Sequence, residues 1–319
     1  MVIASARQSI SVVVPVYNSE TTLSDLTARI IRALGLRNAP YEIVLVNDGS
    51  KDGSWETIKR LSAENPQVRG ISMARNFGQH NALLAGIRSA SYEITVTMDD
   101  DLQNPPEMIE TLVDELARGN DVVYGTPDKE HYTRGRGWLT GVAKRIIARV
   151  IGLESIKDIS SFRAFHTSIR EVFNEFAGSF VDIDILLSWG ASTFAAVPVQ
   201  HDARETGKSN YNFRKLLKHT FDLVASYSVR PLQFASLIGI VFTFLGICIF
   251  LYAIVRFLIA NTVPGFTFLA SMIAIFSGSQ LLVLGIFGEY LGRIHFRVLE
   301  KPTYVVGDIC PPADVTRPA

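Results

Sequence analysis

The segment ITVTMDDDLQNPPEMI, residues 94–109, is the part of the sequence on which the fold assignment rests. An apolar run of strand type leads directly into three consecutive carboxylates, Asp99, Asp100 and Asp101. Neighbouring carboxylates repel one another, so a cation or several hydrogen-bond donors must compensate them. On an extended segment Asp99 and Asp101 would point to the same side, and Gln103 keeps their parity. Asp100 is expected to point the other way and to stabilise the turn.

This acidic cluster predicts a site for a divalent cation, either Mg²⁺ or Mn²⁺. Asp99, Asp101 and Gln103 would supply the oxygen ligands, and a cation between the acids would relieve their repulsion. The same cation could bridge to a diphosphate and neutralise the charge on a leaving group. A solvated acidic loop is the alternative, but an apolar strand that runs straight into the acids favours a site.

The sequence before the acids alternates between strand patterns and helix patterns. Apolar runs of strand length occur at 9–18, 41–50, 68–76 and 92–101, and helical periodicity occurs at 22–34, 54–62 and 78–90. This alternation predicts an α/β fold with a doubly wound, mostly parallel sheet. Ligands of such sheets bind at the carboxyl ends of the strands. The polar stretches VYN, NDGS, ARN and DDD all fall at those ends, so we expect them to share one crevice.

Two of these strand ends suggest a nucleotide. Pro15, Tyr17 and Asn18 offer an aromatic face and polar atoms suited to a base and a ribose. Asp48 could accept hydrogen bonds from a base N–H or from ribose hydroxyls, although NDGS alone is also typical of an ordinary turn with a helix cap. The chain has no GxGxxG or GxxxxGK[ST] stretch, so dinucleotide and Walker-type phosphate binding are poorly supported.

The last third of the chain predicts a transmembrane hairpin. The segments 231–255 and 257–288 contain no charged residue, and a bilayer-spanning helix needs about 20 apolar residues. A helical hairpin in a soluble core is the alternative. Basic residues flank both outer ends of the hairpin, whereas only Arg256 lies near the turn, so both ends should be cytoplasmic. The flanking residues are Arg204, Lys208, Arg214, Lys215, Lys218, Arg230, Arg293, Arg297 and Lys301.

Composition excludes several classes of protein. The 319 residues include 31 Lys and Arg and 31 Asp and Glu, and this zero net charge gives no sign of a nucleic-acid partner. Cys248 and Cys310 form neither a disulfide framework nor a metal-ligand pair. The N-terminus lacks the pattern of a signal peptide. We therefore predict a cytoplasmic domain at 1–200, a juxtamembrane segment at 201–229, the hairpin at 230–292 and a cytoplasmic tail at 293–319.

Several motifs together resemble the GT-A family 2 glycosyltransferases, and in particular their polyprenyl-phosphate branch. The stretches that carry the resemblance are VVVPVYN, VLVNDGS, MDDDLQNPP, FRAF, RNFGQHNALLAGI, RETGKSNYNFRKL and GIFGEYLGRIHFRVLEKPTYVV. They cover about residues 8 to 306, and their order and spacing are specific. One position departs from the pattern, because Ser19 stands where relatives commonly have Glu, and Glu20 follows it. Glu20 is therefore left out of the expected site.

The resemblance implies a nucleotide-sugar donor and a polyprenyl (undecaprenyl) phosphate acceptor in the plasma (inner) membrane. It places Pro15, Tyr17, Asp48 and Asp99 at the donor, and Asp99, Asp101 and Gln103 around the metal. A UDP-hexose such as UDP-glucose is favoured, and GDP-mannose, for a polyprenyl-phosphate mannose synthase, is the alternative. A homo-oligomer such as a tetramer is compatible with this class.

The resemblance also implies residues for the acceptor and for the reaction. Arg134, Arg136 and Ser209 would bind the acceptor phosphate, and Asp158, Arg163 and Arg204 would be catalytic, with Arg163 holding phosphate. A phosphate monoester with a second pKa near about 6 is already largely a dianion at neutral pH, so no strong general base is needed. Direct attack would invert the anomeric carbon.

Two other functions fit less well. A processive polysaccharide synthase would call for a QxxRW stretch, which this sequence lacks. An inert membrane scaffold with a GT-A shell would have no reason to keep the metal-site acids, and these are present. The expected protein is therefore an inverting membrane glycosyltransferase.

Overall fold

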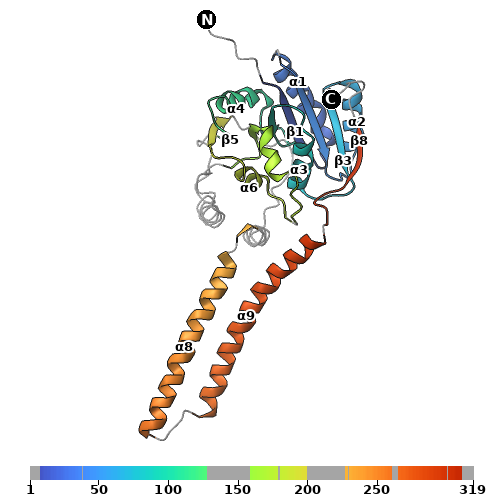
Figure 1. Ribbon diagram of the computed structural model, residues 1–319. Coiled ribbons are helices and arrows are strands. Elements are labelled where there is room, and N and C mark those ends of the chain that lie inside the picture. Colours follow the sequence, from blue (N-terminus) through green and yellow to red (C-terminus); the bar gives the residue numbers. More distant parts are fainter. Residues whose placement is uncertain are drawn as a thin grey trace. The chain divides into compact units, whose positions relative to one another are not determined.

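The computed structural model describes residues 8–37, 39–127, 159–178, 180–199, 227–228, 230–260, 265–299 and 301–310 of the chain (Figure 1). The chain divides into two compact units. One comprises Met1–Asn210 with Pro302–Ala319, and the other comprises Tyr211–Lys301.

The first unit is built on one sheet, in which the described residues form eight strands in the order β7-β5-β6-β4-β1-β2-β3-β8. The central strands β1 (Ile10–Val16), β2 (Tyr41–Asn47), β3 (Val68–Met73) and β4 (Ile94–Thr97) pair in parallel. They confirm the four strands predicted from apolar runs. The register Val13↔Val44 and Val13↔Thr97 aligns their carboxyl ends.

Antiparallel pairs extend the sheet on both sides. Strand β6 (Arg163–His166) pairs antiparallel with β4 and with β5 (Val122–Pro127), and β7 (Phe194–Val199) pairs parallel with β5. At the other edge β8 (Val306–Cys310) runs antiparallel to β3. The sequence predicted residues 293–319 only as a tail, so this edge strand was not foreseen.

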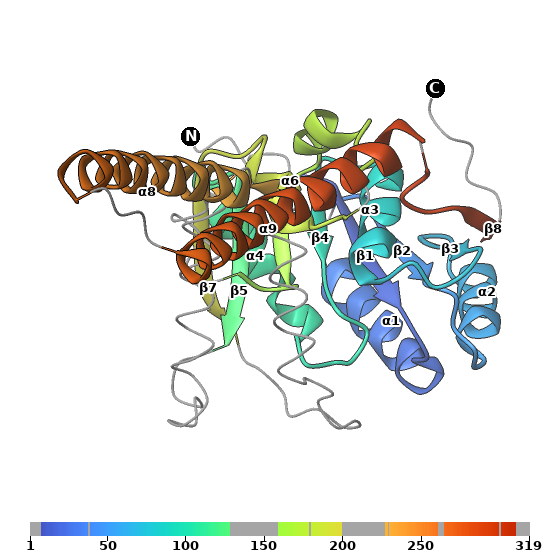
Figure 2. The ribbon, with the colours of Figure 1, turned by 90° about the horizontal axis from the view of Figure 1, so that it is seen from below.

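Helices cover the two faces of the sheet (Figure 2). On one face lie α1 (Glu20–Gly35), α2 (Ser54–Glu64) and α4 (Ile109–Leu116), which follows the short 3₁₀ helix η1 (Pro106–Met108). On the other face α3 (Gln79–Ser89) packs against β1 and β2, with η3 (Thr167–Phe173) and α6 (Ile183–Ser188) beside it. Gly86 allows this close approach, because a Cβ there would collide with the Val13 side chain.

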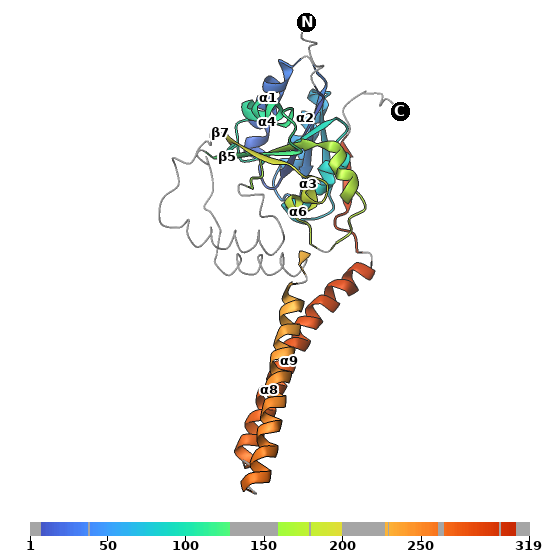
Figure 3. The same cartoon turned by 60° about the vertical axis from the view of Figure 1, so that its left-hand side comes forward.

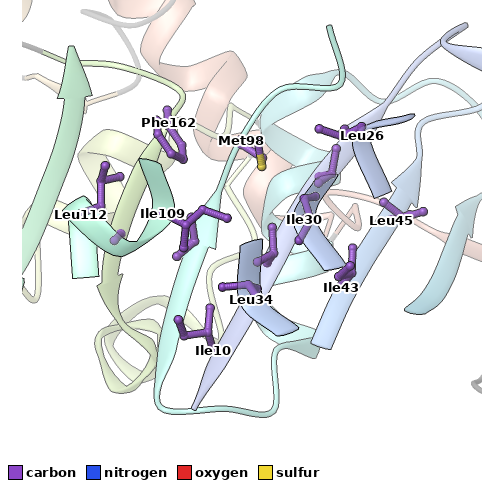
Figure 4. Close-up of a cluster of buried hydrophobic side chains, with 14 of the residues drawn as sticks. Ile10, Leu26, Ile30, Leu34, Ile43, Leu45, Met98, Ile109, Leu112 and Phe162 are labelled. Atoms are coloured by element: carbon purple, nitrogen blue, oxygen red, sulfur yellow. The ribbon is translucent and has the colours of Figure 1, made fainter. Parts of the chain in front are cut away.

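The core on the α1 face explains why these segments fold as they do (Figure 4). Leu26, Ile30 and Leu34 recur at helical spacing on α1 and are fully buried against alternate residues of β1 and β2, such as Ile10 and Ile43. Each fully buried side chain of this type contributes on the order of 1.5–3 kcal/mol. The same cluster includes Ile109 and Leu112 of α4, together with Met98 just after β4 and Phe162 just before β6. It therefore packs beneath the start of the acidic loop.

The second unit consists of two long helices, α8 (Arg230–Ala260) and α9 (Phe266–Val298), which run side by side (Figure 3). They contain two candidate membrane spans, Leu232–Tyr252 and Ile275–Gly292, with mean hydropathies of 2.6 and 1.2. Large apolar side chains on both helices are exposed, as expected of helices in lipid and unlike those of a soluble core. The prediction of two long apolar helices is confirmed.

The two helices contact each other through aromatic side chains. The rings of Phe242 and Phe276 meet edge to face with centroids 6.0 Å apart. Near the outer end of the hairpin the Tyr290 hydroxyl donates a 2.6 Å hydrogen bond to the carbonyl of Ser228. These contacts hold the pair together at two levels.

Candidate active site

The turn after β1 is tied to the turn after β2. The backbone N–H of Lys51 donates to Asn18 Oδ1 at 2.8 Å, and Asn18 itself adopts a positive φ of 55°. Glu20 accepts from the Gly53 N–H at 2.9 Å, while its own N–H donates to Asp52 Oδ2 at 3.2 Å. Glu20 therefore links the first turn of α1 to the turn after β2.

Tyr17 and Pro15 end β1 in different environments. The Tyr17 side chain is 47% exposed, so its ring is available to a ligand. Pro15 is buried in the strand opposite Val46. The exposed aromatic face at this strand end therefore comes from Tyr17, and a place for Pro15 at the donor stays a prediction.

Asp48 follows β2 and is only 3% exposed. Its Oδ1 accepts the Phe77 N–H at 2.7 Å, and its Oδ2 accepts the Gly78 N–H at 2.8 Å. Burial raises the pKa of Asp48, although these two backbone hydrogen bonds lower it. Asp48 thus fixes the loop between β3 and α3. The next residue, Gly49, has a φ of 63° and approaches the neighbouring backbone too closely for any Cβ.

The acidic loop is bent rather than extended. Strand β4 ends at Thr97, residues 100–102 form bends, and Leu102 has a φ of 60°. The alternation argument therefore does not apply to Asp101 and Gln103, because it holds only for extended backbone. The place of Asp99, Asp101 and Gln103 around a metal stays a prediction. The backbone N–H of Gln103 instead donates to Asp101 Oδ1 at 3.2 Å.

Two polar side chains from separate elements hold Asp99. Gln79, at the start of α3, donates from Nε2 to Asp99 Oδ1 at 2.7 Å. Ser161, just before β6, donates from Oγ to Asp99 Oδ2 at 2.5 Å. Neither Gln79 nor Ser161 was predicted as a site residue. Gln79 lies in the stretch RNFGQHNALLAGI and Ser161 directly precedes FRAF, but nothing local indicates that they meet at Asp99.

Asp100 points to the turn after β1. Its Oδ2 accepts the Tyr17 N–H at 3.1 Å and the Ser19 hydroxyl at 2.5 Å. Burial raises the pKa of Asp100, and the charges of Asp99 and Asp101 raise it further, against the lowering effect of the two hydrogen bonds. The three acids therefore lie close enough to repel one another.

Arg163 has a different partner from the one predicted. It is 2% exposed in β6 and forms an ion pair with Asp184, which also accepts the Tyr124 hydroxyl at 3.0 Å. Burial lowers the pKa of Arg163, but Asp184 and the other nearby acidic groups outweigh this, so its pKa is raised. The prediction that Arg163 holds phosphate is thus corrected, because its guanidinium is enclosed with a carboxylate.

The acids of this loop fit one particular kind of metal site. Within the parts of the chain that the structure describes, no three His, Cys, Asp or Glu side chains are grouped so as to hold a metal ion alone. Mg²⁺ commonly binds through one or two carboxylates together with substrate phosphates and water. Asp99 and Asp101 match that pattern, so they suit a cation that arrives with a diphosphate.

The remaining predicted residues cannot be placed. Asp158, Arg134, Arg136, Arg204 and Ser209 all lie outside the described residues.

Residues 11–175, just over half of the chain, match the family model described as Glycosyl transferase family 2. The chain belongs to this family. It is therefore a glycosyltransferase, and the predicted family and enzyme class are confirmed. The family range runs from the second residue of β1 past the end of β6, so it contains the carboxyl ends of β1, β2, β3 and β4.

Two curated relatives match almost the whole chain. The undecaprenyl-phosphate 4-deoxy-4-formamido-L-arabinose transferase of Shewanella sediminis is 35% identical over 304 residues, covering 94% of this chain and 92% of its own. The transferase of the same name from Edwardsiella ictaluri is 36% identical over 314 residues, covering 95% and 94%. These relatives confirm the resemblance to the polyprenyl-phosphate branch.

Solved structures show the same fold. Glucosyl-3-phosphoglycerate synthase from Mycobacterium tuberculosis, in complex with Mn²⁺, UDP and phosphoglyceric acid, matches with a TM-score of 0.51 and 19% identity. The match covers 69% of this chain and 78% of that one. The GT-A-like architecture is thus confirmed.

Proposed function

We propose that this glycosyltransferase moves a sugar from a nucleotide sugar to a polyprenyl phosphate at the inner membrane. The observation that supports it most strongly is the extent of the match to the undecaprenyl-phosphate transferases. At 94–95% of the chain, that match includes both the sheet unit and the two apolar helices. A lipid acceptor would account for the two helices. Its phosphate lies at the membrane surface, and helices in the bilayer would keep the enzyme beside it.

The donor is proposed to bind along the strand ends of β1 and β4. The exposed Tyr17 ring offers a surface for a base. Asp99 and Asp101 offer carboxylates for a cation that would bind the diphosphate end. Mg²⁺ or Mn²⁺ would be held there by Asp99 and Asp101 and would neutralise the charge on the departing nucleoside diphosphate. Asp48 would act indirectly, because both of its oxygens support the loop before α3.

The acceptor needs orientation more than activation. A phosphate monoester dianion is already a nucleophile at neutral pH, so the proposed duty of the protein is to place it in line with the sugar. Arg134, Arg136 and Ser209 are proposed to bind its phosphate, with Asp158 and Arg204 orienting the reacting groups. Direct displacement by the phosphate would invert the anomeric configuration.

The identity of the sugar is the point on which the sequence and the relatives differ. The sequence favours a UDP-hexose such as UDP-glucose, whereas the relatives are named for 4-deoxy-4-formamido-L-arabinose. A decisive experiment incubates the purified full-length protein with undecaprenyl phosphate and a panel of UDP and GDP sugars. The panel includes UDP-glucose and the UDP derivative of 4-deoxy-4-formamido-L-arabinose. We expect one donor to give a lipid-linked product, and Asp101→Asn to give none.

Undecaprenol, which lacks the phosphate, is the matched control acceptor. It should remain unmodified, because it lacks both the nucleophile and the anion that the arginines bind. Transfer to undecaprenol, or the absence of any lipid-linked product across the panel, would refute the proposed function.

Donor and acceptor sites can be separated with Arg136→Ala. Removing one charge-assisted hydrogen bond costs about 1.5–3 kcal/mol, so kcat/KM for the polyprenyl phosphate should fall roughly ten- to a hundredfold. Calorimetric binding of the nucleotide sugar without lipid should be unchanged. Loss of donor binding with a normal lipid dependence would instead place Arg136 at the diphosphate.

The predicted arrangement in the membrane also remains a proposal. We place the domain at 1–200, the segment at 201–229 and the tail at 293–319 on the cytoplasmic side, with the hairpin at 230–292 in the bilayer. A homo-oligomer such as a tetramer is compatible with this arrangement.

A further inference from the structure

Asp100 is the one acid of the DDD stretch to which the proposed function gives no role. Its contacts join the ends of two strands that are adjacent in the sheet but far apart in sequence. The carboxylate lies in the loop after β4, and both groups that donate to it, the Tyr17 N–H and the Ser19 hydroxyl, lie in the turn after β1.

A further hydrogen bond strengthens this link. The hydroxyl of Thr22 in α1 donates to the backbone carbonyl of Asp100 at 2.7 Å. Three hydrogen bonds therefore connect one residue of the acidic loop to residues 17–22. The backbone of Tyr17 is held in this way, while its side chain stays 47% exposed.

The neighbouring acids are held differently. Asp99 is held by Gln79 and Ser161, and Asp101 accepts from the backbone of Gln103. Asp100 bonds to the turn that carries the exposed tyrosine. Each of the three acids thus has hydrogen-bond partners in a different part of the fold. Moving one acid into the place of another would break these hydrogen bonds.

We propose that Asp100 is a positioning residue, which holds Tyr17 at a fixed place relative to Asp99 and Asp101 so that one nucleoside diphosphate can contact all three. This inference rests on the proposed function, in which Tyr17 meets the base and the two acids meet the diphosphate end. Asp100 itself touches neither ligand nor metal.

The hydrogen bonds of Asp100 allow a test that separates its role as a hydrogen-bond acceptor from any role of its negative charge. Both hydrogen bonds converge on a single oxygen, Oδ2, so an asparagine can place its amide oxygen there and accept both. Asp100→Asn therefore keeps the link and removes the charge, whereas Asp100→Ala removes both. If Asp100 acted as a metal ligand, the asparagine variant would fail as Asp101→Asn does.

A matched control lies at the amino end of β5, away from the carboxyl ends of the central strands. Asp121, which precedes β5, also accepts two donors on one oxygen, the N–H groups of Ser192 at 2.7 Å and Thr193 at 2.9 Å. Asp121→Ala thus removes a comparable pair of hydrogen bonds, but at a distance from the carboxyl ends of the strands where the donor is proposed to bind. It should lower the melting temperature without changing nucleotide affinity.

The experiment measures binding of UDP and of GDP in the presence of MnCl₂ by calorimetry, with the full-length protein in detergent. We expect Asp100→Ala to weaken binding by about tenfold or more, the change produced by losing roughly 1.4 kcal/mol. Asp100→Asn should stay within about threefold of the wild type. In steady-state assays the alanine variant should raise KM for the nucleotide sugar and leave KM for the polyprenyl phosphate unchanged.

Hydrogen exchange without any nucleotide supplies an independent readout. The peptide around Tyr17 should exchange faster in Asp100→Ala and at the wild-type rate in Asp100→Asn, because only the former loses the acceptor for the Tyr17 N–H.

Three results would overturn the inference. If Asp100→Ala binds nucleotide as tightly as the wild type, or if Asp100→Asn is as weak as the alanine variant, Asp100 does not act by positioning, and the proposed function still stands. If the wild type binds neither UDP nor GDP, the proposed function fails and the positioning role fails with it.

Discussion

The buried pair of Arg163 and Asp184 gives the sharpest test of the structure, because the sequence predicted a different role for Arg163. The two residues are 2% and 7% exposed. Asp184→Asn would leave the guanidinium buried without a counter-charge, and breaking a buried pair in this way costs about 3–5 kcal/mol. For a domain of this size each kcal/mol lowers the melting temperature by about 2–4 °C, so we expect a fall of roughly 6–20 °C.

The measurement is thermal unfolding in detergent, followed by intrinsic fluorescence, with the transition of the sheet unit scored separately from any transition of the helices. The combined variant Arg163→Met, Asp184→Leu and Tyr124→Phe removes the charges and the hydroxyl together. It should recover much of the lost stability, because well-packed apolar side chains can replace a buried ion pair. Glu107→Gln is the control, since its ion pair with Arg29 is at the surface and contributes about 1 kcal/mol or less.

One pattern of results would refute this reasoning. If Asp184→Asn melted within about 2 °C of the wild type while Arg163→Met retained stability and lost transfer, the guanidinium would be serving the reaction. Arg163 would then hold phosphate, as the sequence first predicted.

Other predictions follow from the same contacts. EDTA should abolish transfer and Asp101→Asn should mimic it with an unchanged melting temperature, whereas full turnover in EDTA would exclude a metal. Asp48→Asn should lower the melting temperature, because each oxygen of Asp48 accepts a separate N–H and the new amide nitrogen would face one of them. The Arg29 hydrogen bond lowers the pKa of Glu107, so the stability difference between the wild type and Glu107→Gln should be present at neutral pH and vanish as pH falls through that lowered pKa. A cysteine in the NTVPG turn should react with an impermeant thiol reagent outside intact cells, and one beside Lys208 should not; the reverse pattern would overturn the orientation.

The central fold could be predicted because its pattern is local. Parallel strands buried on both faces are continuous apolar runs, as in β1 and β2, and the helices between them show 3.6-residue periodicity. Strand β8 could not be found in this way. Its sequence VGDIC is short and is interrupted by Gly307 and Asp308, its residues are mostly exposed, and its partner β3 lies more than 200 residues earlier.

The candidate site was predictable by residue type but not by geometry. The acids and the exposed Tyr17 stand at strand ends, where a parallel sheet must place them. Leu102 packs against the core and has a positive φ of 60°, so the alternation expected for Gln103 does not apply. The counter-charge of Arg163 is Asp184 of α6, which lies 21 residues further along the chain. No local sequence pattern predicts that pair.

The position of β8 has a consequence for the order in which the protein is built. Its residues 306–310 are synthesised after both long apolar helices, yet they cover the free edge of β3, which leaves the ribosome near residue 73. An uncovered strand edge is a template for pairing with another chain. During synthesis this edge therefore lacks β8 for more than 200 residues and for the whole hairpin, and in that interval it is open to pairing with another chain.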